Sequence, residues 1–169
     1  VFKKILIANR GEIAVRLIRA CTEMNITSVA VYADADHNAL HVKKADEAYC
    51  LGSEPVSGYL NAHHLVNIAL ASGCDAIHPG YGFLSENAQF AQICEQRHIK
   101  FIGPSSEVIS SLGNKIHARE TMIKAGIPVT PGSKGNLKDV AEALSIADNI
   151  GYPIMLKATS GGGGRGIRL

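Results

Sequence analysis

A glycine-rich segment near the end of the sequence has the residue types of a phosphate-binding loop. Four consecutive glycines, Gly161–Gly164, follow the apolar segment Ile154–Ala158, which is typical of a strand. Glycine leaves its backbone N–H groups uncovered, so these groups can approach phosphate oxygens closely. Lys157 and Arg165 place a positive charge on each side of the run. A phosphate site is therefore the favoured interpretation, and a flexible hairpin tip is the alternative.

Two familiar nucleotide-binding motifs are excluded by residues at fixed positions. The string Gly161–Gly166 is not followed by the Lys and the Ser or Thr that a P-loop requires. A dinucleotide fingerprint that starts at Gly80 would need glycine at Ser85, and the turn Asn9–Ala14 holds a single glycine. We therefore expect neither a P-loop mechanism nor a nicotinamide cofactor.

A second glycine cluster lies in the segment His78–Asn87, where Gly80 and Gly82 flank Tyr81. This segment follows the predicted strand Ala76–His78 and precedes a predicted helix. Open α/β sheets bind their ligands at the carboxyl ends of the strands. The position therefore predicts a ligand site in this segment.

Lys115 lies near the start of a predicted helix, where the helix dipole already leaves partial positive charge. A lysine at this position is favourable when an anion compensates the charge, which indicates a phosphate. An exposed lysine without a ligand is the alternative.

The histidines show no metal-binding pattern. An adjacent pair points to different faces of a helix, and four others have no ligand spacing with it: His63 and His64, then His37, His41, His98 and His117. We expect surface roles for all six. A G-x-S-x-G motif is absent and no cysteine is flanked by an evident base, so nucleophilic catalysis is not expected either.

Short apolar segments alternate with helical patterns over the first two thirds of the sequence. The segments that indicate strands are Ile5–Ala8, Ser28–Tyr32, Ala48–Leu51, Ala76–His78 and Lys100–Ile102. Asn9 with Glu12 resembles a capping box for a helix after the first strand, and Ser85 is the candidate cap of a helix that contains Phe90 and Cys94. The alternation predicts an α/β fold with a mostly parallel sheet.

The last third of the sequence is mainly helical before it ends in strands. A helix from about 114 to 125 ends at Gly126, and a Pro/Gly-rich passage over 126–132 is typical of a domain junction. A further helix ends at Gly151, and Ile154–Ala158 and Ile167–Leu169 are predicted to form a hairpin. Because a folded domain rarely ends on an unpaired strand, we expect the natural chain to continue beyond Leu169.

Composition excludes several classes of partner. The formal net charge of the 169 residues is +2, which is too small to indicate a nucleic-acid or membrane partner. No apolar run is long enough to span a membrane, and no signal peptide is evident. The four cysteines are far apart, which is typical of free thiols in a reducing compartment. We expect a cytoplasmic location, or a mitochondrial matrix or plastid if a transit peptide has been removed.

Seven segments, taken in order, resemble the biotin carboxylase family. They are Lys4–Ala14, Ala45–Ala48, Tyr59–Asn61, Ala76–Asn87, Phe101–Pro104, Gly113–Lys115 and Lys157–Arg168. The resemblance covers the whole chain. It implies a Rossmann-like, parallel-sheet domain over 1–113 that precedes the ATP-grasp domain, and the incomplete start of that domain over 114–169.

The resemblance also implies an activity, that of an ATP-dependent ligase. The family uses ATP and Mg²⁺, or Mn²⁺, to activate bicarbonate as carboxyphosphate, and then carboxylates biotin attached to a carrier. Implied partners are a biotin carboxyl carrier protein or domain, a carboxyltransferase subunit and a second copy of the chain in a homodimer.

Site residues carry over at the matching positions. The residues that resemble the family's ATP-binding set are Lys115, Lys157, Gly161, Gly162, Gly163, Gly164, Arg165 and Gly166. Tyr81 and Gly82 match the stretch that faces the biotin and bicarbonate end of the site. Ser160 departs from the Gly or Ala of many members, a small change. The family's metal-binding glutamates, bicarbonate-binding arginine and general base lie beyond this sequence, so we expect the 169-residue chain alone to be inactive.

Two other functions remain open at this point. The chain could be a non-catalytic assembly or dimerisation module, with Arg16, Arg19 and Glu23 on the polar face of the first helix as contacts. Solvated charges are the simpler interpretation of these three residues. It could also belong to another ATP-grasp ligase, such as a carbamoyl-phosphate or purine-biosynthesis enzyme.

Overall fold

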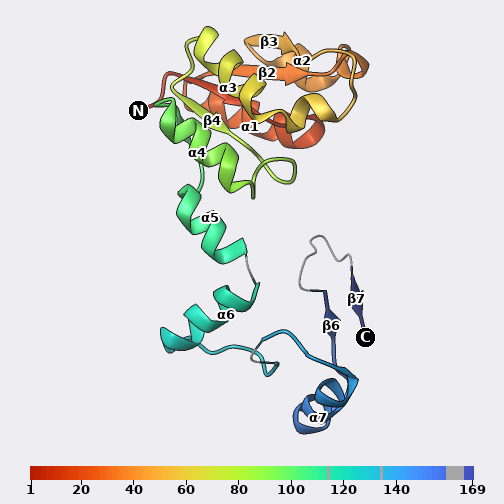
Figure 1. Ribbon diagram of the computed structural model, residues 1–169. Coiled ribbons are helices and arrows are strands. Elements are labelled where there is room, and N and C mark those ends of the chain that lie inside the picture. Colours follow the sequence, from red (N-terminus) through yellow and green to blue (C-terminus); the bar gives the residue numbers. More distant parts are fainter. Residues whose placement is uncertain (114, 134, 159–165) are drawn as a thin grey trace. The chain divides into compact units, whose positions relative to one another are not determined.

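The chain forms two compact units, Val1–Ser110 and Ser111–Leu169 (Figure 1). The computed structural model describes residues 1–113, 115–133, 135–158 and 166–169. The proposed ATP contacts Gly161–Gly164 and Arg165 lie outside the described residues. The passage 126–132, which the sequence marks as a junction, lies inside the second unit.

The first unit is built on a parallel sheet. Its five strands are β1 (Lys4–Ile7), β2 (Thr27–Tyr32), β3 (Glu47–Cys50), β4 (Ala76–His78) and β5 (Lys100–Phe101). They lie in the order β3-β2-β1-β4-β5, and every neighbouring pair is parallel. The chain therefore builds outward from β1 to β3 and then returns to the other side of β1. The predicted α/β class and parallel sheet are confirmed, with each of the five strands within one residue of its expected bounds at either end.

Helices cover both faces of this sheet. The helical elements are α1 (Gly11–Glu23), η1 (Asp34–Asp36), α2 (Leu40–Lys44), η2 (Ser57–Leu60), α3 (Ala62–Ala71), α4 (Ala88–Gln96) and α5 (Ser106–Gly113), in which the division between the units falls. Ile5 and Ile7 of β1 pack with the apolar side of α1, whereas Leu6 packs with α3 and α4. The alternation of a strand's side chains thus produces two cores.

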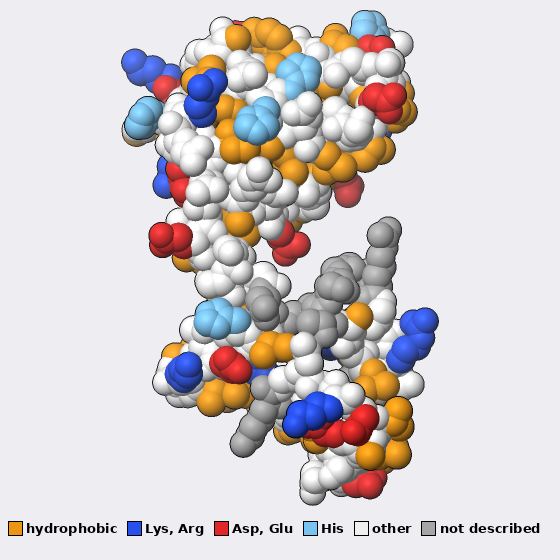
Figure 2. Space-filling model, in the orientation of Figure 1, with side chains coloured by type: hydrophobic (Ala, Val, Ile, Leu, Met, Phe, Trp, Pro, Cys, Tyr) orange, Lys and Arg blue, Asp and Glu red, His pale blue; other side chains and the backbone are white. Residues whose placement is uncertain are grey.

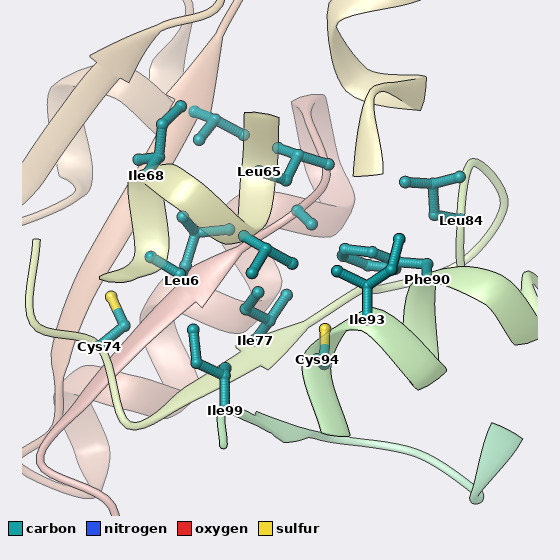
Figure 3. Close-up of a cluster of buried hydrophobic side chains, with 14 of the residues drawn as sticks. Leu6, Leu65, Ile68, Cys74, Ile77, Leu84, Phe90, Ile93, Cys94 and Ile99 are labelled. Carbon is teal, nitrogen blue, oxygen red and sulfur yellow. The ribbon is translucent and has the colours of Figure 1, made fainter. Parts of the chain in front are cut away.

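The larger core lies between the sheet and the helices α3 and α4 (Figure 3). Leu6, Leu65, Ile77 and Phe90 are fully buried there. Burying such a side chain contributes about 1.5–3 kcal/mol, so this layer fixes the positions of the loops that leave the strands. Phe90 also meets Phe101 edge to face, with ring centroids 5.7 Å apart.

The second unit contains α6 (Lys115–Lys124), α7 (Val140–Ile150) and the antiparallel pair β6 (Leu156–Lys157) and β7 (Ile167–Arg168). Asp139 caps α7 by accepting a hydrogen bond from the Glu142 N–H at 2.8 Å. The predicted hairpin is confirmed. Its first strand is shorter than the predicted Ile154–Ala158, because only Leu156 and Lys157 pair with described residues of β7.

Two predicted helix caps are wrong, for a tertiary reason. Arg10, not Asn9, occupies the cap position of α1, and it makes no side-chain capping bond. Asn9 instead binds carbonyl groups that follow β4. The cap of α4 is Asn87 rather than Ser85, with Asn87 Oδ1 accepting from the Phe90 N–H at 2.9 Å.

The surface of the described residues matches the small net charge. On the face of the molecule in Figure 2, basic and acidic side chains are interspersed. No helix among the described residues is long and apolar enough to cross a membrane. All four cysteines are free; Cys21, Cys74 and Cys94 are buried and Cys50 is exposed.

Candidate functional site

The candidate site of the first unit lies where β1 and β4 end side by side. These strands are neighbours in the sheet, and the Ala8 N–H extends their pairing by donating to the His78 carbonyl at 2.9 Å. The chain order reverses between them, and open α/β sheets form their ligand crevice at such a point. The sheet therefore brings the turn after β1 and the glycine pair after β4 to the same edge.

Asn9 joins the two loops at this edge. Its side-chain N–H groups donate to the Pro79 and Tyr81 carbonyls, both at 2.8 Å, and its Oδ1 accepts from the Arg10 N–H at 2.9 Å. Asn9 is only 2% exposed, so these bonds form away from competing water. The amide therefore holds the backbone on both sides of Gly80.

Gly80 lets the loop approach Asn9 closely. Its φ is +66°, in the left-handed region, and its N–H donates to His78 Nδ1 at 3.0 Å. A Cβ at this position would lie 2.6 Å from Asn9 Nδ2 and 2.7 Å from Ile13 Cγ2. The space beside Gly80 is thus occupied by the side chains of Asn9 and Ile13. Burial lowers the pKa of His78, which favours the neutral ring whose Nδ1 accepts this bond.

An ionic network joins the loop after β1 to the loop after β2, with Asp36 buried and Arg10 about half exposed. Arg10 Nε donates to Asp36 Oδ2 at 2.6 Å and Arg10 Nη2 donates to Asp36 Oδ1. The Tyr59 hydroxyl donates to Asp36 Oδ2 at 2.7 Å and accepts from the Ala33 N–H at 3.2 Å. The Arg10 bonds lower the pKa of Asp36 to about 2, against the opposing effect of burial. Burial, reinforced by Asp36, raises the pKa of Tyr59 to about 12.

This network extends to the loop through an aromatic stack. The ring of Phe83 stacks on Tyr59 with centroids 5.3 Å apart and an interplanar angle of 17°. Between the two anchored positions, Tyr81 is 78% exposed, and a Cβ on Gly82 would meet nothing within 4 Å. A fixed backbone thus presents an exposed phenol and an accessible glycine, groups that can contact a ligand.

Residue types and spacing did not indicate this network. Arg10, Asp36 and Tyr59 are far apart in the sequence, and none lies in a glycine cluster. The available signal was position alone, because Arg10 and Asp36 both lie just beyond the carboxyl ends of strands.

The expected surface role of His41 is wrong. His41 is 1% exposed, its Nε2 lies 3.3 Å from the Val31 carbonyl, and its Nδ1 has no hydrogen-bond partner. The short helix α2 turns this side chain toward the sheet, and burial lowers its pKa. His37, His63, His98 and His117 are exposed as expected, and His64 is half-buried. The described residues contain no group of three or more potential metal ligands.

The candidate phosphate site lies in the second unit. Lys157 is exposed on β6 opposite Ile167, and the Ala158 N–H donates to the Gly166 carbonyl at 3.0 Å. Gly166 has φ +74°, and a Cβ there would lie 2.8 Å from Ala158 Cβ. The end of β6 and the start of β7, which flank the glycine run, therefore lie close together. Lys115 is the first residue of α6, as predicted.

An open cavity of about 1000 Å³ borders this hairpin. Its lining comes from α6, α7 and the segments 130–133, 135–137 and 153–158, and includes Arg119, Ile146, Met155 and Lys157. Apolar walls with a few polar groups are typical of small-molecule sites. The cavity places the Lys157 side chain beside an apolar surface.

The sequence of the chain matches two family models in this order. Residues 1–109 match the N-terminal domain of biotin carboxylase, and residues 114–169 match the ATP-binding domain of the carbamoyl-phosphate synthase L chain. The first match covers well over half of the chain. The chain belongs to the biotin carboxylase family. The resemblance to this family that the seven motif segments indicated is confirmed.

Individual relatives agree with this assignment. The chain is 58% identical over 168 residues to Biotin carboxylase 1 of Bacillus subtilis and 57% identical to the 2-oxoglutarate carboxylase small subunit of Hydrogenobacter thermophilus. In both cases 99% of this chain is covered, but it spans only 37% and 36% of the relatives. The alternative of another ATP-grasp ligase is not favoured by these matches.

Solved structures of the family match nearly the full length of this chain. The biotin carboxylase domain dimer of the Hydrogenobacter thermophilus 2-oxoglutarate carboxylase, in complex with MgADP, ADP and bicarbonate, has a TM-score of 0.91 at 57% identity. Biotin carboxylase from Campylobacter jejuni has a TM-score of 0.92 at 48% identity. These matches cover 99% of this chain and 37% and 38% of the solved chains.

Proposed function

We propose that this chain is the N-terminal portion of a biotin carboxylase, an ATP-dependent ligase. In the proposed reaction, bicarbonate attacks the γ-phosphorus of ATP to give carboxyphosphate and ADP. The carboxyl group then passes to a ureido nitrogen of carrier-bound biotin, the bond to phosphate breaks, and the proton of the ureido nitrogen leaves with the released inorganic phosphate. The observation that carries the proposal is identity of 58% over essentially the whole chain with a biotin carboxylase. The assembly-module alternative has weaker support: Arg16, Arg19 and Glu23 are exposed on α1, as solvated charges are.

We assign the nucleotide to the second unit. The cavity beside β6 fits ATP because it offers apolar surface for a base and two cations, Lys157 and Arg119, for phosphates. Lys115, Gly161–Gly164, Arg165 and Gly166 complete the proposed set. Phosphoryl transfer depends mainly on positioning and charge neutralisation, which lysines and backbone N–H groups supply. Mg²⁺, or Mn²⁺, supplies further neutralisation when bound with the nucleotide.

We assign Tyr81 and Gly82 to the biotin and bicarbonate end. Tyr81 is exposed and uncharged, and the open space at Gly82 leaves its backbone accessible. Both properties suit binding of a planar ureido ring. We also assign 1–113 to the N-terminal domain and 114–169 to the start of the ATP-grasp domain, an assignment that the family matches over 1–109 and 114–169 support.

The proposed partners follow the family. They are a biotin carboxyl carrier protein or domain, a carboxyltransferase subunit and a second copy of the chain. The solved biotin carboxylase domain of Hydrogenobacter thermophilus, which is a dimer, supports the last of these. We propose a cytoplasmic location or, as for the chloroplastic relative of Arabidopsis thaliana, an organelle.

Replacement of Lys157 tests the nucleotide assignment. In a full-length enzyme that carries this segment, Lys157→Ala should raise the KM for ATP or lower kcat by roughly tenfold to a hundredfold, the value of a charge-assisted hydrogen bond of about 1.5–3 kcal/mol. Arg168→Ala is the matched control, because Arg168 is an exposed cation on the partner strand. Equal effects of the two substitutions on ATP kinetics would contradict the assignment.

A second test addresses the extent of the chain. Residues 1–169 alone, given ATP, Mg²⁺, bicarbonate and free biotin, should show no bicarbonate-dependent ATP hydrolysis. Turnover close to that of a full-length relative would show that the site needs nothing beyond Leu169.

A further inference from the structure

The exposed Tyr81–Gly82 pair is held from both ends by groups that do not reach solvent. On one side, Asn9 binds the Pro79 and Tyr81 carbonyls. On the other side, the Phe83 ring stacks on Tyr59, which is fully buried. The two anchors belong to different loops, one after β1 and one before α3. The ligand-facing pair is therefore fixed by its neighbours rather than by contacts of its own.

The backbone between these anchors requires such support. Gly80 and Gly82 have φ +66° and +68°, and Phe83 has φ +45°. A non-glycine residue in the left-handed region is unfavourable unless the surroundings hold it there. Phe83 is held on its side chain by Tyr59, and the next residue, Leu84, is buried in the core that contains Phe90 (Figure 3).

Tyr59 is itself held rigidly. Its hydroxyl donates to Asp36 at 2.7 Å, and Asp36 is fixed in turn by two bonds from Arg10. Arg10 directly follows Asn9, whose Oδ1 accepts from the Arg10 N–H. The Asn9 anchor and the Tyr59 anchor are thus linked through Arg10 and Asp36, and they form one connected frame around the loop. None of these four side chains is in the predicted set of ligand contacts.

We propose that Asn9 and Tyr59 are positioning residues that set the Tyr81–Gly82 backbone for the biotin and bicarbonate end of the reaction. This proposal rests on the proposed function of Tyr81 and Gly82. Tyr59 acts through its ring, by stacking on Phe83. Asn9 acts through its amide N–H groups, by fixing the carbonyls on both sides of Gly80. Arg10 and Asp36 hold the Tyr59 ring in place.

The frame is tested first without using activity. In the full-length enzyme, Tyr59→Leu removes the stack, whereas Tyr59→Phe keeps the ring and removes only the hydroxyl bonds. Hydrogen exchange read by mass spectrometry should rise at least about fivefold for peptides over 79–87 in Tyr59→Leu, because without the stack on Phe83 the bonds from the Ser85 and Asn87 amides to the Gly82 and Leu84 carbonyls open more often. Phe101→Leu is the control, a buried aromatic of the same core on β5. Unchanged exchange in Tyr59→Leu, or an equal rise in Phe101→Leu, overturns the proposal.

Steady-state kinetics then separate positioning from general loss of structure. Tyr59→Leu and Asn9→Asp should raise the KM for biotin or bicarbonate about tenfold while the KM for ATP stays within about twofold, and Tyr59→Phe, which keeps the stacked ring but loses the bond to Asp36, should raise these KM values clearly less than Tyr59→Leu. A structural role alone would lower the active fraction, and so kcat, with every KM unchanged, which would overturn the proposal. Tyr81→Ala separates the proposed function of the loop from the positioning role. If Tyr81→Ala leaves biotin and bicarbonate kinetics unchanged, the proposed function of the loop fails. If Tyr81→Ala changes these kinetics and Tyr59→Leu does not, only the positioning role is refuted.

Discussion

Replacement of Gly80 by alanine should destabilise the first unit far more than replacement of Gly82. Both glycines have left-handed φ values, +66° and +68°, so each substitution carries the same backbone cost of about 1–2 kcal/mol. The space around them differs. A Cβ on Gly80 would lie 2.6 Å from Asn9 Nδ2, whereas a Cβ on Gly82 would meet nothing within 4 Å. The difference between the two substitutions therefore measures the steric clash alone, because the backbone strain is the same in both.

The steric part can be estimated from the bonds that Asn9 would lose. Its two donated hydrogen bonds contribute about 1 kcal/mol each, and a displaced buried amide adds a desolvation cost. We therefore expect Gly80→Ala to lower the free energy of unfolding by about 3–4 kcal/mol and Gly82→Ala by about 1–2 kcal/mol. Urea denaturation followed by far-ultraviolet circular dichroism measures both values.

A double substitution identifies the clashing partner. If the Cβ that Gly80→Ala adds acts on Asn9, the combination of Gly80→Ala with Asn9→Ala should cost about 1–2 kcal/mol less than the two single changes together. Equal destabilisation by Gly80→Ala and Gly82→Ala, or strict additivity of the double variant, would refute the steric argument.

Three further predictions follow from charge and burial. The pKa of Asp36 is about 2 against an ordinary 3.8, so its ionised form adds about 2 kcal/mol to the free energy of unfolding, and this contribution is lost as the pH falls from about 4 to about 2. Unfolding measured against pH should show the loss in the parent and not in Asp36→Asn. Because burial lowers the pKa of His41, its contribution to stability is present above about pH 6.5 and is lost below it; His41→Leu should flatten that part of the melting-temperature profile, and an unchanged slope would contradict burial as the cause. A thiol reagent should modify one cysteine, Cys50, in the native chain and all four cysteines after denaturation. The rate of Cys50 modification should keep rising above pH 9, because the hydrogen bond to Asp34 raises the pKa of Cys50. Rapid labelling of a second thiol in the native chain would contradict the burial of the other three.

Local sequence patterns determined the elements of this fold. Apolar segments bounded by turn residues placed the strands of the parallel sheet, and the hairpin of β6 and β7 was expected from the residues that flank the glycine run. These signals succeed because a strand or a helix is defined by dihedral angles and side-chain periodicity that a few neighbouring residues encode. The ordered motifs likewise indicated the family, which the comparisons confirm.

Only the tertiary structure decided what the polar residues at the sheet edge bind. Asn9 has the side chain of a helix cap and lies just before a helix. Parallel pairing of β1 with β4 nevertheless brings the Pro79 and Tyr81 carbonyls within 2.8 Å of its amide, which binds them instead of capping the helix. Asp36 meets Arg10 across 26 positions and Tyr59 across 23, because the strand order brings the loops after β1 and β2 together. His41 is buried although its short helix gave no apolar pattern. Such contacts depend on which strands become neighbours, a property of the whole sheet that no local window of sequence contains.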